Sequence, residues 1–224
     1  GPRGQRYAAL REEADAIARS VLDEARRWGD DWGAAMMQNL RAAIRLWAGD
    51  IDEARALGDR ALATFRRLED RFGVMQALGT LSRVYVALGH AGDADRTSEE
   101  LLVLSGYFGQ MAFPSQGAAG TAMHLGQGAR ARELAADAIV RLNATGANFD
   151  EARVIAAFGR LLEGDADGAL AELLEVDVER SPFALAARAT ALVLVGDRRG
   201  ALADVERQAA IASATYWDRA VAQV

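Results

Sequence analysis

The fold is decided by residues 46–54, which read LWAGDIDEA. An apolar helix end leads into Gly49, a polar residue follows, and Ala54 stands five positions after the glycine. Glycine adopts the left-handed conformation that ends a helix without the steric cost of a Cβ atom. This stretch therefore predicts two helices joined by a short turn at Gly49.

The same phrase returns four more times along the chain. It reads ALGHAGDA, HLGQGARA, LEGDADGA and LVGDRRGA, and the spacings between successive glycines are 40, 37, 38 and 32 residues. A small residue also stands seven positions before each glycine. The glycines are Gly49, Gly89, Gly126, Gly164 and Gly196, and the small residues are Ala42, Ser82, Ala119, Ala157 and Ala189.

Small residues at fixed offsets from a turn predict a close crossing of the two helices that the turn joins. The alanine five positions after each glycine should be buried at that crossing. These alanines are Ala54, Ala94, Ala131, Ala169 and Ala201. Each hairpin can bury only one face, so neighbouring hairpins must stack to complete a core.

The pattern resembles the tetratricopeptide repeat, most clearly in residues 46–62 (LWAGDIDEARALGDRAL) and 85–96 (YVALGHAGDADR). The resemblance extends over about residues 33–213, although these repeats are longer than the family's norm of about 34 residues. The family's aromatic residue in the first helix is clearly present only as Tyr85. The longer repeats are similar to those in the C-terminal sensor regions of large bacterial transcription regulators.

We expect an all-α fold, an α-solenoid of about five TPR-like helical hairpins plus one unpaired helix at each end. The hairpins are expected at residues 33–69, 71–105, 113–144, 148–178 and 182–213. The unpaired helices are expected from Tyr7 to Trp28 and from Tyr216 onward.

The chain's ends lead to two further expectations. Residues 1–6 read as a tag remnant with a disordered start, and residues 7–224 as a single TPR-like solenoid domain. Exposed apolar faces on the two end helices predict that the chain self-associates, or that flanking segments cover them.

The composition argues against several classes of function. The net charge of −6 and pI near 5.1 disfavour a dedicated nucleic-acid binder. All 26 basic residues are arginine, so the lysine of a phosphate-binding loop is missing. The absence of cysteine excludes thiolate metal sites, and two histidines leave little for metal or acid–base chemistry. We expect no cofactor, no metal site and no catalysis, with an enzyme of unknown class as the remote alternative.

The hydropathy of the chain disfavours a membrane protein. No stretch approaches the roughly 18–20 uninterrupted apolar residues that cross a bilayer. With no signal-like segment at the start either, the expected location is the cytoplasm.

By resemblance, the first helix of each hairpin lines a concave binding groove. Relatives that clamp a partner's C-terminal carboxylate use lysine, asparagine and arginine there, and Asn39 and Arg83 alone do not make that clamp. The positions expected to face inward are mixed and largely apolar. An amphipathic helix of a protein partner, or a small apolar ligand, fits such a lining better.

The third repeat predicts a notch in this groove. Gly117 and Gly120 fall at inward positions of the first helix of this repeat. The position equivalent to Gly120 is occupied by Arg83 in the preceding repeat and by Phe158 in the following one. A bound partner is therefore expected to contact Arg83 and Phe158. The remaining residues expected to line the notch are Thr80, Phe113, Gln116 and His124. The alternative is that the glycines only permit tight helix packing.

The sequence thus predicts a protein- or ligand-binding module of a larger bacterial regulatory protein. A stand-alone scaffold that self-associates through its open ends, as in a homodimer, is the alternative. No direct contact with nucleic acid or membrane is expected.

Overall fold

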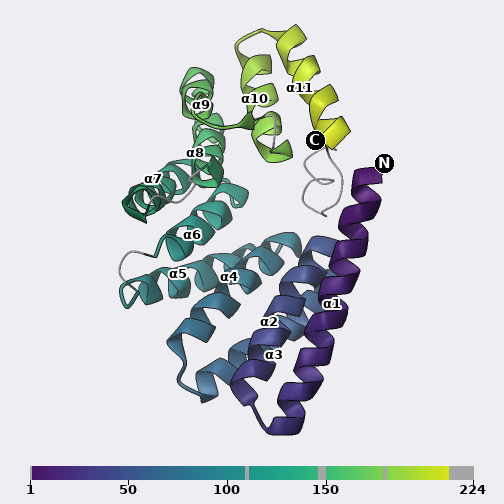
Figure 1. Cartoon of the computed structure of the whole chain (residues 1–224). Helices are drawn as coiled ribbons and strands as arrows, with labels where there is room; N and C mark the ends of the chain where they lie inside the picture. Colours follow the sequence, from purple (N-terminus) through teal and green to yellow (C-terminus); the bar gives the residue numbers. More distant parts are fainter. Residues whose placement is uncertain (1, 109–110, 146–149, 179–180, 212–224) are drawn as a thin grey trace. The chain divides into compact units, whose positions relative to one another are not determined.

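The computed structural model describes residues 2–108, 111–145, 150–178 and 181–211. Every element assigned within these ranges is a helix (Figure 1). The N-terminal helix is followed by five hairpins, as predicted. The helices are α1 (Pro2–Trp28), α2 (Asp31–Ala48), α3 (Ile51–Arg67), α4 (Arg71–Ala87), α5 (Ala91–Ser105), α6 (Phe113–His124), α7 (Gly128–Thr145), α8 (Asp150–Leu162), α9 (Ala166–Leu173), α10 (Pro182–Leu194) and α11 (Arg198–Ile211).

The prediction of an all-α repeat fold is confirmed. Helix α1 begins at Pro2, upstream of the start expected at Tyr7. The second unpaired helix, expected from Tyr216, lies outside the described residues.

The helices form two compact units, one ending at Leu104 and the other beginning at Ser105. In the first unit α1 packs on α2, α2 on α3, and α4 on both α2 and α3. In the second unit each helix from α6 to α10 packs on the next, and α8 also packs on α6 and α10. Each unit is thus a stack of hairpins, while the single domain predicted for residues 7–224 stays a prediction.

The hairpin turns have the predicted geometry. All five repeat glycines have positive φ, from 71° at Gly89 to 92° at Gly49. Gly29, which ends α1, has φ 69° and adds a sixth turn of the same kind that the repeat pattern did not include. An L-residue with a side chain rarely adopts this conformation, which explains why glycine recurs at these turns.

The predicted helix crossings are confirmed as well. Four of the five alanines after the glycines are fully buried, and the fifth, Ala201, is 4% exposed. The small residues seven positions before the glycines are also buried, from 0% exposed at Ala42 to 6% at Ala189. Both offsets therefore mark the contact between paired helices.

A short motif, Asp-x-x-Gly, begins four of the helices. The Asp30 carboxylate accepts a hydrogen bond from Gly33 N at 2.8 Å, and Asp165 accepts one from Gly168 N at the same distance. The equivalent bonds at α4 and α11 measure 3.1 and 2.9 Å. An acidic N-cap satisfies a backbone donor that the helix leaves unpaired and complements the positive end of the helix dipole.

A pair of glycines brings α7 and α8 into close contact in the second unit. A Cβ atom on Gly159 would lie 2.9 Å from the carbonyl oxygen of Gly128, and one on Gly128 would lie 2.6 Å from the carbonyl oxygen of Gly159. Both contacts are with backbone atoms, which cannot rotate away. The two helices can approach this closely only because neither residue has a side chain.

Candidate binding surfaces

The residues expected to bind a partner lie on the first helices of the hairpins. Asn39, Thr80 and Arg83 belong to the first unit, on α2 and α4. The other predicted site residues belong to the second unit, on α6 and α8. They are Phe113, Gln116, Gly117, Gly120, His124 and Phe158.

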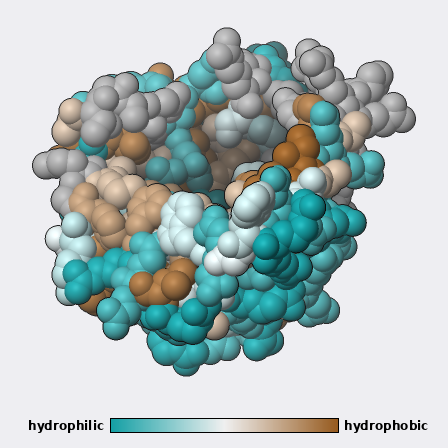
Figure 2. Space-filling model, turned by 60° about the horizontal axis from the view of Figure 1, so that its bottom comes forward, coloured by the Kyte–Doolittle hydropathy of each residue, from teal (hydrophilic) through white to brown (hydrophobic). Residues whose placement is uncertain are grey.

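Helix α2 presents an apolar surface to solvent. Leu40 is 45% exposed and Trp47, two turns later, is 40% exposed. Met36 and Ala43 continue the same side of the helix and are partly exposed. We call these four residues the α2 strip. Figure 2 shows hydrophobic patches, in brown, among the hydrophilic residues of one face of the molecule.

Asn39 lies next to the α2 strip in the sequence and is 8% exposed. Its Oδ1 atom is buried and accepts no hydrogen bond from the described part of the chain. A buried acceptor without a donor costs roughly 1–3 kcal/mol.

Helix α4 contributes polar groups to the first unit. Gln76, Thr80 and Arg83 are all partly exposed, and the Thr80 hydroxyl donates to the Gln76 carbonyl at 3.3 Å. Because α4 packs against α2, both helices can contribute to one binding surface.

In the second unit, the predicted residues of α6 differ in accessibility. Phe113, Gln116 and Gly120 are partly exposed, and His124 is exposed at the helix end. Gly117 is buried. A Cβ atom on Gly120 would meet Ile155 Cδ1 at 3.8 Å, an ordinary van der Waals distance.

Phe158 of α8 is partly buried and stacks at a tilt on Phe183, with ring centroids 4.7 Å apart. Both rings pack against buried residues of α8 and α10. This position strengthens the core and still leaves part of the Phe158 ring accessible.

The notch predicted around Gly120 requires Arg83 and Phe158 to contact one ligand. Arg83 belongs to the first unit and Phe158 to the second. The structure defines each unit by itself, so the notch stays a prediction.

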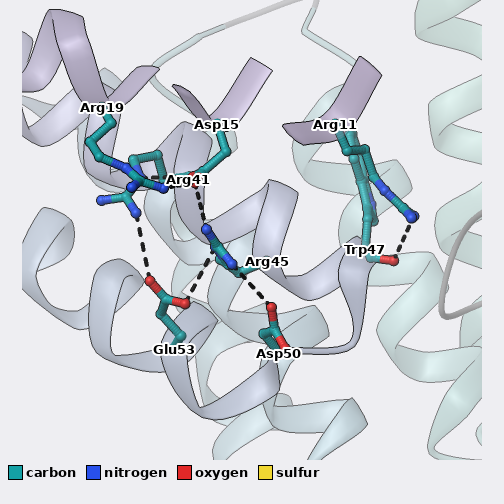
Figure 3. A network of polar contacts seen from close by, with 8 residues as sticks. All are labelled: Arg11, Asp15, Arg19, Arg41, Arg45, Trp47, Asp50 and Glu53. Carbon is teal, nitrogen blue, oxygen red and sulfur yellow. Dashed lines mark hydrogen bonds and ion pairs between the residues drawn. The ribbon is translucent and has the colours of Figure 1, made fainter. Parts of the chain in front are cut away.

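A buried ion-pair network near α2 was not predicted (Figure 3). Asp15 of α1 is 4% exposed and accepts hydrogen bonds from Arg19 at 2.6 Å, Arg41 at 2.8 Å and Arg45 at 2.5 Å. Burial alone raises the pKa of Asp15, but the bonds from Arg41, Arg19 and Arg45 outweigh it and lower the pKa to about 2.

The same arginines reach into the first hairpin. Glu53 of α3 lies 3.6 Å from Arg41 and 3.3 Å from Arg45, which also donates to Asp50 at 3.2 Å. The network therefore joins α1, α2 and α3.

A second buried carboxylate, Asp204 of α11, accepts two bonds of 2.7 Å from Arg188. Arg41 and Arg188 both stand eight positions before their repeat glycines. The other repeats have small or apolar residues at this position, namely Leu81, Ala118 and Ala156. An arginine at a position that is otherwise apolar was the signal that could have revealed both ion pairs.

Neither a metal site nor a membrane span is found in the described ranges. No three or more histidine or acidic side chains there are grouped to hold a metal ion. None of the described helices combines the length and the hydropathy needed to cross a membrane.

Comparison with known proteins identifies the repeat. Residues 33–102, which span the first two hairpins, match the tetratricopeptide repeat family. The crystal structure of BtubC (BKLC) from P. vanneervenii has the same fold, with a TM-score of 0.67 over 90% of each chain and 19% sequence identity. No curated protein matches the sequence. The tetratricopeptide repeat is a protein-interaction fold, and all-helical repeats of this kind are typically non-enzymatic scaffolds.

Proposed function

We propose that this chain, a tetratricopeptide-like stack of helical hairpins, is a non-enzymatic binding module whose α2–α4 surface holds a segment of a protein partner. The observation that carries the proposal is the exposed α2 strip, on a helix that packs against α4 with its partly exposed polar side chains. Apolar contacts would supply the affinity, and the polar groups of α4 would fix the orientation of the segment.

An amphipathic helix is the partner segment that fits this surface best. Leu40 and Trp47 are seven residues apart, so they present apolar side chains about 10.5 Å apart along the α2 axis. A ligand helix with apolar residues at the same spacing could cover both. The regulatory setting that the resemblance implies and the cytoplasmic location expected from the hydropathy both belong to this proposal.

The test is selection from a displayed library of random peptides long enough to form an amphipathic helix. We expect the enriched peptides to bind the wild-type chain and to lose about tenfold or more in affinity to Trp47→Ala. Val103→Ala is the control, because Val103 is an exposed apolar residue outside α2 and α4, at 70%. Equal loss in both variants, or in neither, would refute the α2 strip as the binding surface.

The notch has a separate test with the same enriched peptides. If a partner also contacts Arg83 and Phe158, Arg83→Ala should weaken binding of peptides that carry an acidic group, and Gly120→Leu should weaken all of them. Unchanged affinity in both folded variants would confine the site to the α2–α4 surface.

A further inference from the structure

One side of α1 carries a stripe of exposed apolar side chains. Leu10 is 50% exposed, Ile17 58%, Val21 43% and Trp28 80%. On a helix with 3.6 residues per turn, these four residues lie within about 40° of one another. We call them the outer stripe.

Packing within the first unit does not account for the outer stripe. The side of α1 that packs against α2 is formed by other residues, including Ala18 and Leu22, which are 1% and 2% exposed. The solvent side of such a helix is ordinarily polar. A second, continuous apolar side indicates an interaction surface.

We propose that the outer stripe is a homodimer interface, on which a second copy of the chain lays its own α1 antiparallel. The spacing of the stripe carries this inference. Leu10 and Trp28 each lie nine residues from Arg19, and Ile17 and Val21 each lie two residues from it. A two-fold axis that crosses the contact at the height of Arg19 along the helix therefore superimposes each stripe on the stripe of the second copy.

This symmetry matches the requirement for an isologous contact, in which the same patch on both copies is self-complementary. In the antiparallel arrangement Leu10 faces the partner's Trp28, and Ile17 faces the partner's Val21. A large side chain meets a smaller one at both ends. A parallel arrangement would instead set the two tryptophans against each other at one end.

Charged residues along one border of the stripe also contribute. Glu13, Glu24 and Arg27 are exposed there. In the antiparallel register, Glu13 comes within two residues of the partner's Arg27, about 3 Å along the helix axis. Glu24 comes next to the partner's Glu13, and these two carboxylates repel each other. The apolar stripe therefore supplies the net attraction, and Glu24 offers a way to test the register.

The contact is of modest size. Leu10 to Trp28 spans about 27 Å of helix, so the expected dimer is reversible rather than obligate. It is independent of the partner site on α2 and α4, so failure of one proposal leaves the other intact.

The first test is sedimentation equilibrium of the intact 224-residue chain. We expect a reversible dimer whose Kd rises about tenfold or more in Ile17→Glu, because each copy then buries a charge at the centre of the contact. Val103→Glu is the matched control, since Val103 is an exposed apolar residue of α5, at 70%, and its substitution should leave the Kd unchanged. A wild-type monomer up to about 1 mM, or an unchanged Kd in folded Ile17→Glu, would overturn the proposal.

The second test addresses the antiparallel register, using the chain's lack of cysteine. A mixture of Ile17→Cys and Val21→Cys chains should form a disulfide-linked heterodimer. Two Ile17→Cys copies should not cross-link, because their cysteines are offset by about 6 Å along the axis in addition to the helix separation. Cross-linking of Ile17→Cys with itself, and none in the mixture, would overturn the register.

A charge reversal gives an independent measure of the register. Glu24→Arg should lower the dimer Kd by about two- to fivefold, because it turns the repulsive pair with the partner's Glu13 into an attractive one. A higher Kd in Glu24→Arg would contradict the antiparallel arrangement.

Discussion

Asp15 is paired with three arginines, which come from two helices. Asp15→Asn should lower the free energy of unfolding by about 2–4 kcal/mol, because it removes the buried charge that pairs with all three arginines and leaves Arg41 and Arg45 only their longer contacts with Glu53 and Asp50. Urea unfolding at neutral pH measures this loss. Asp23→Asn is the control on the same helix, since Asp23 forms an exposed pair with Arg26 at 3.7 Å and its substitution should change stability by less than about 0.5 kcal/mol.

The same residue predicts how stability depends on pH. The pKa of Asp15 is about 2 in the folded chain, below its ordinary value of 3.8, so the folded state binds its proton more weakly than the unfolded state does. The stabilisation is therefore fully present above about pH 4 and is lost as pH falls toward 2. As pH falls across this range, the free energy of unfolding of the wild type should converge on that of the Asp15→Asn variant. A constant difference between the two chains would contradict the assignment.

Two glycines on neighbouring helices should respond in opposite ways to alanine. Gly159→Ala should destabilise the chain by about 1–3 kcal/mol, because the new Cβ atom meets the backbone of α7. Gly120→Ala should be neutral or stabilising by up to about 1 kcal/mol, because its Cβ atom has room and alanine favours the helix. Thermal unfolding of the two variants measures both changes in stability. Equal changes in Gly159→Ala and Gly120→Ala would show that the α7–α8 contact is looser than described.

At the scale of the helix, the crossing alanines set how closely a hairpin can pack. Ala131 is fully buried where α7 packs against α6. Ala131→Leu should overpack this crossing and cost about 1–3 kcal/mol of stability. Ala129→Leu, an exposed position on the same helix, should cost much less. An unchanged melting temperature in Ala131→Leu would contradict the crossing geometry.

The helices show which features a sequence can reveal. The hairpins were predictable because Gly49 and Ala54 act within a few residues of each other, so the turn and the crossing both leave a local pattern. The Asp15 network was not, since Asp15 lies 26 and 30 residues from Arg41 and Arg45 and no local rule pairs them. The accessibility of the binding surface also required structure, because the periodicity places Asn39 at an inward position but does not show that its Oδ1 atom is buried.

For the whole molecule, the main prediction concerns cooperativity between the two compact units. Three of the four tryptophans lie in the first unit, at positions 28, 32 and 47, and Trp217 lies outside the described residues. In the Trp217→Phe variant, tryptophan fluorescence therefore reports on unfolding of the first unit alone, while circular dichroism reports on the unfolding of all helices. We expect the two urea transitions to coincide, because neighbouring repeats of a solenoid stabilise one another. Separate transitions would show two independent domains.

The constancy of the hairpin turn also bears on how such a chain can gain or lose residues over evolution. Each turn uses one left-handed glycine followed by a single residue before the next helix, whereas α9 has 8 residues and α3 has 17. The first helices differ as well, from 18 residues in α2 to 12 in α6, so both helices and the segments between hairpins take up the differences in repeat length. Insertions, deletions and engineered tags should be tolerated in the segments between hairpins, while a single residue added at a glycine turn would shift the register of the whole hairpin.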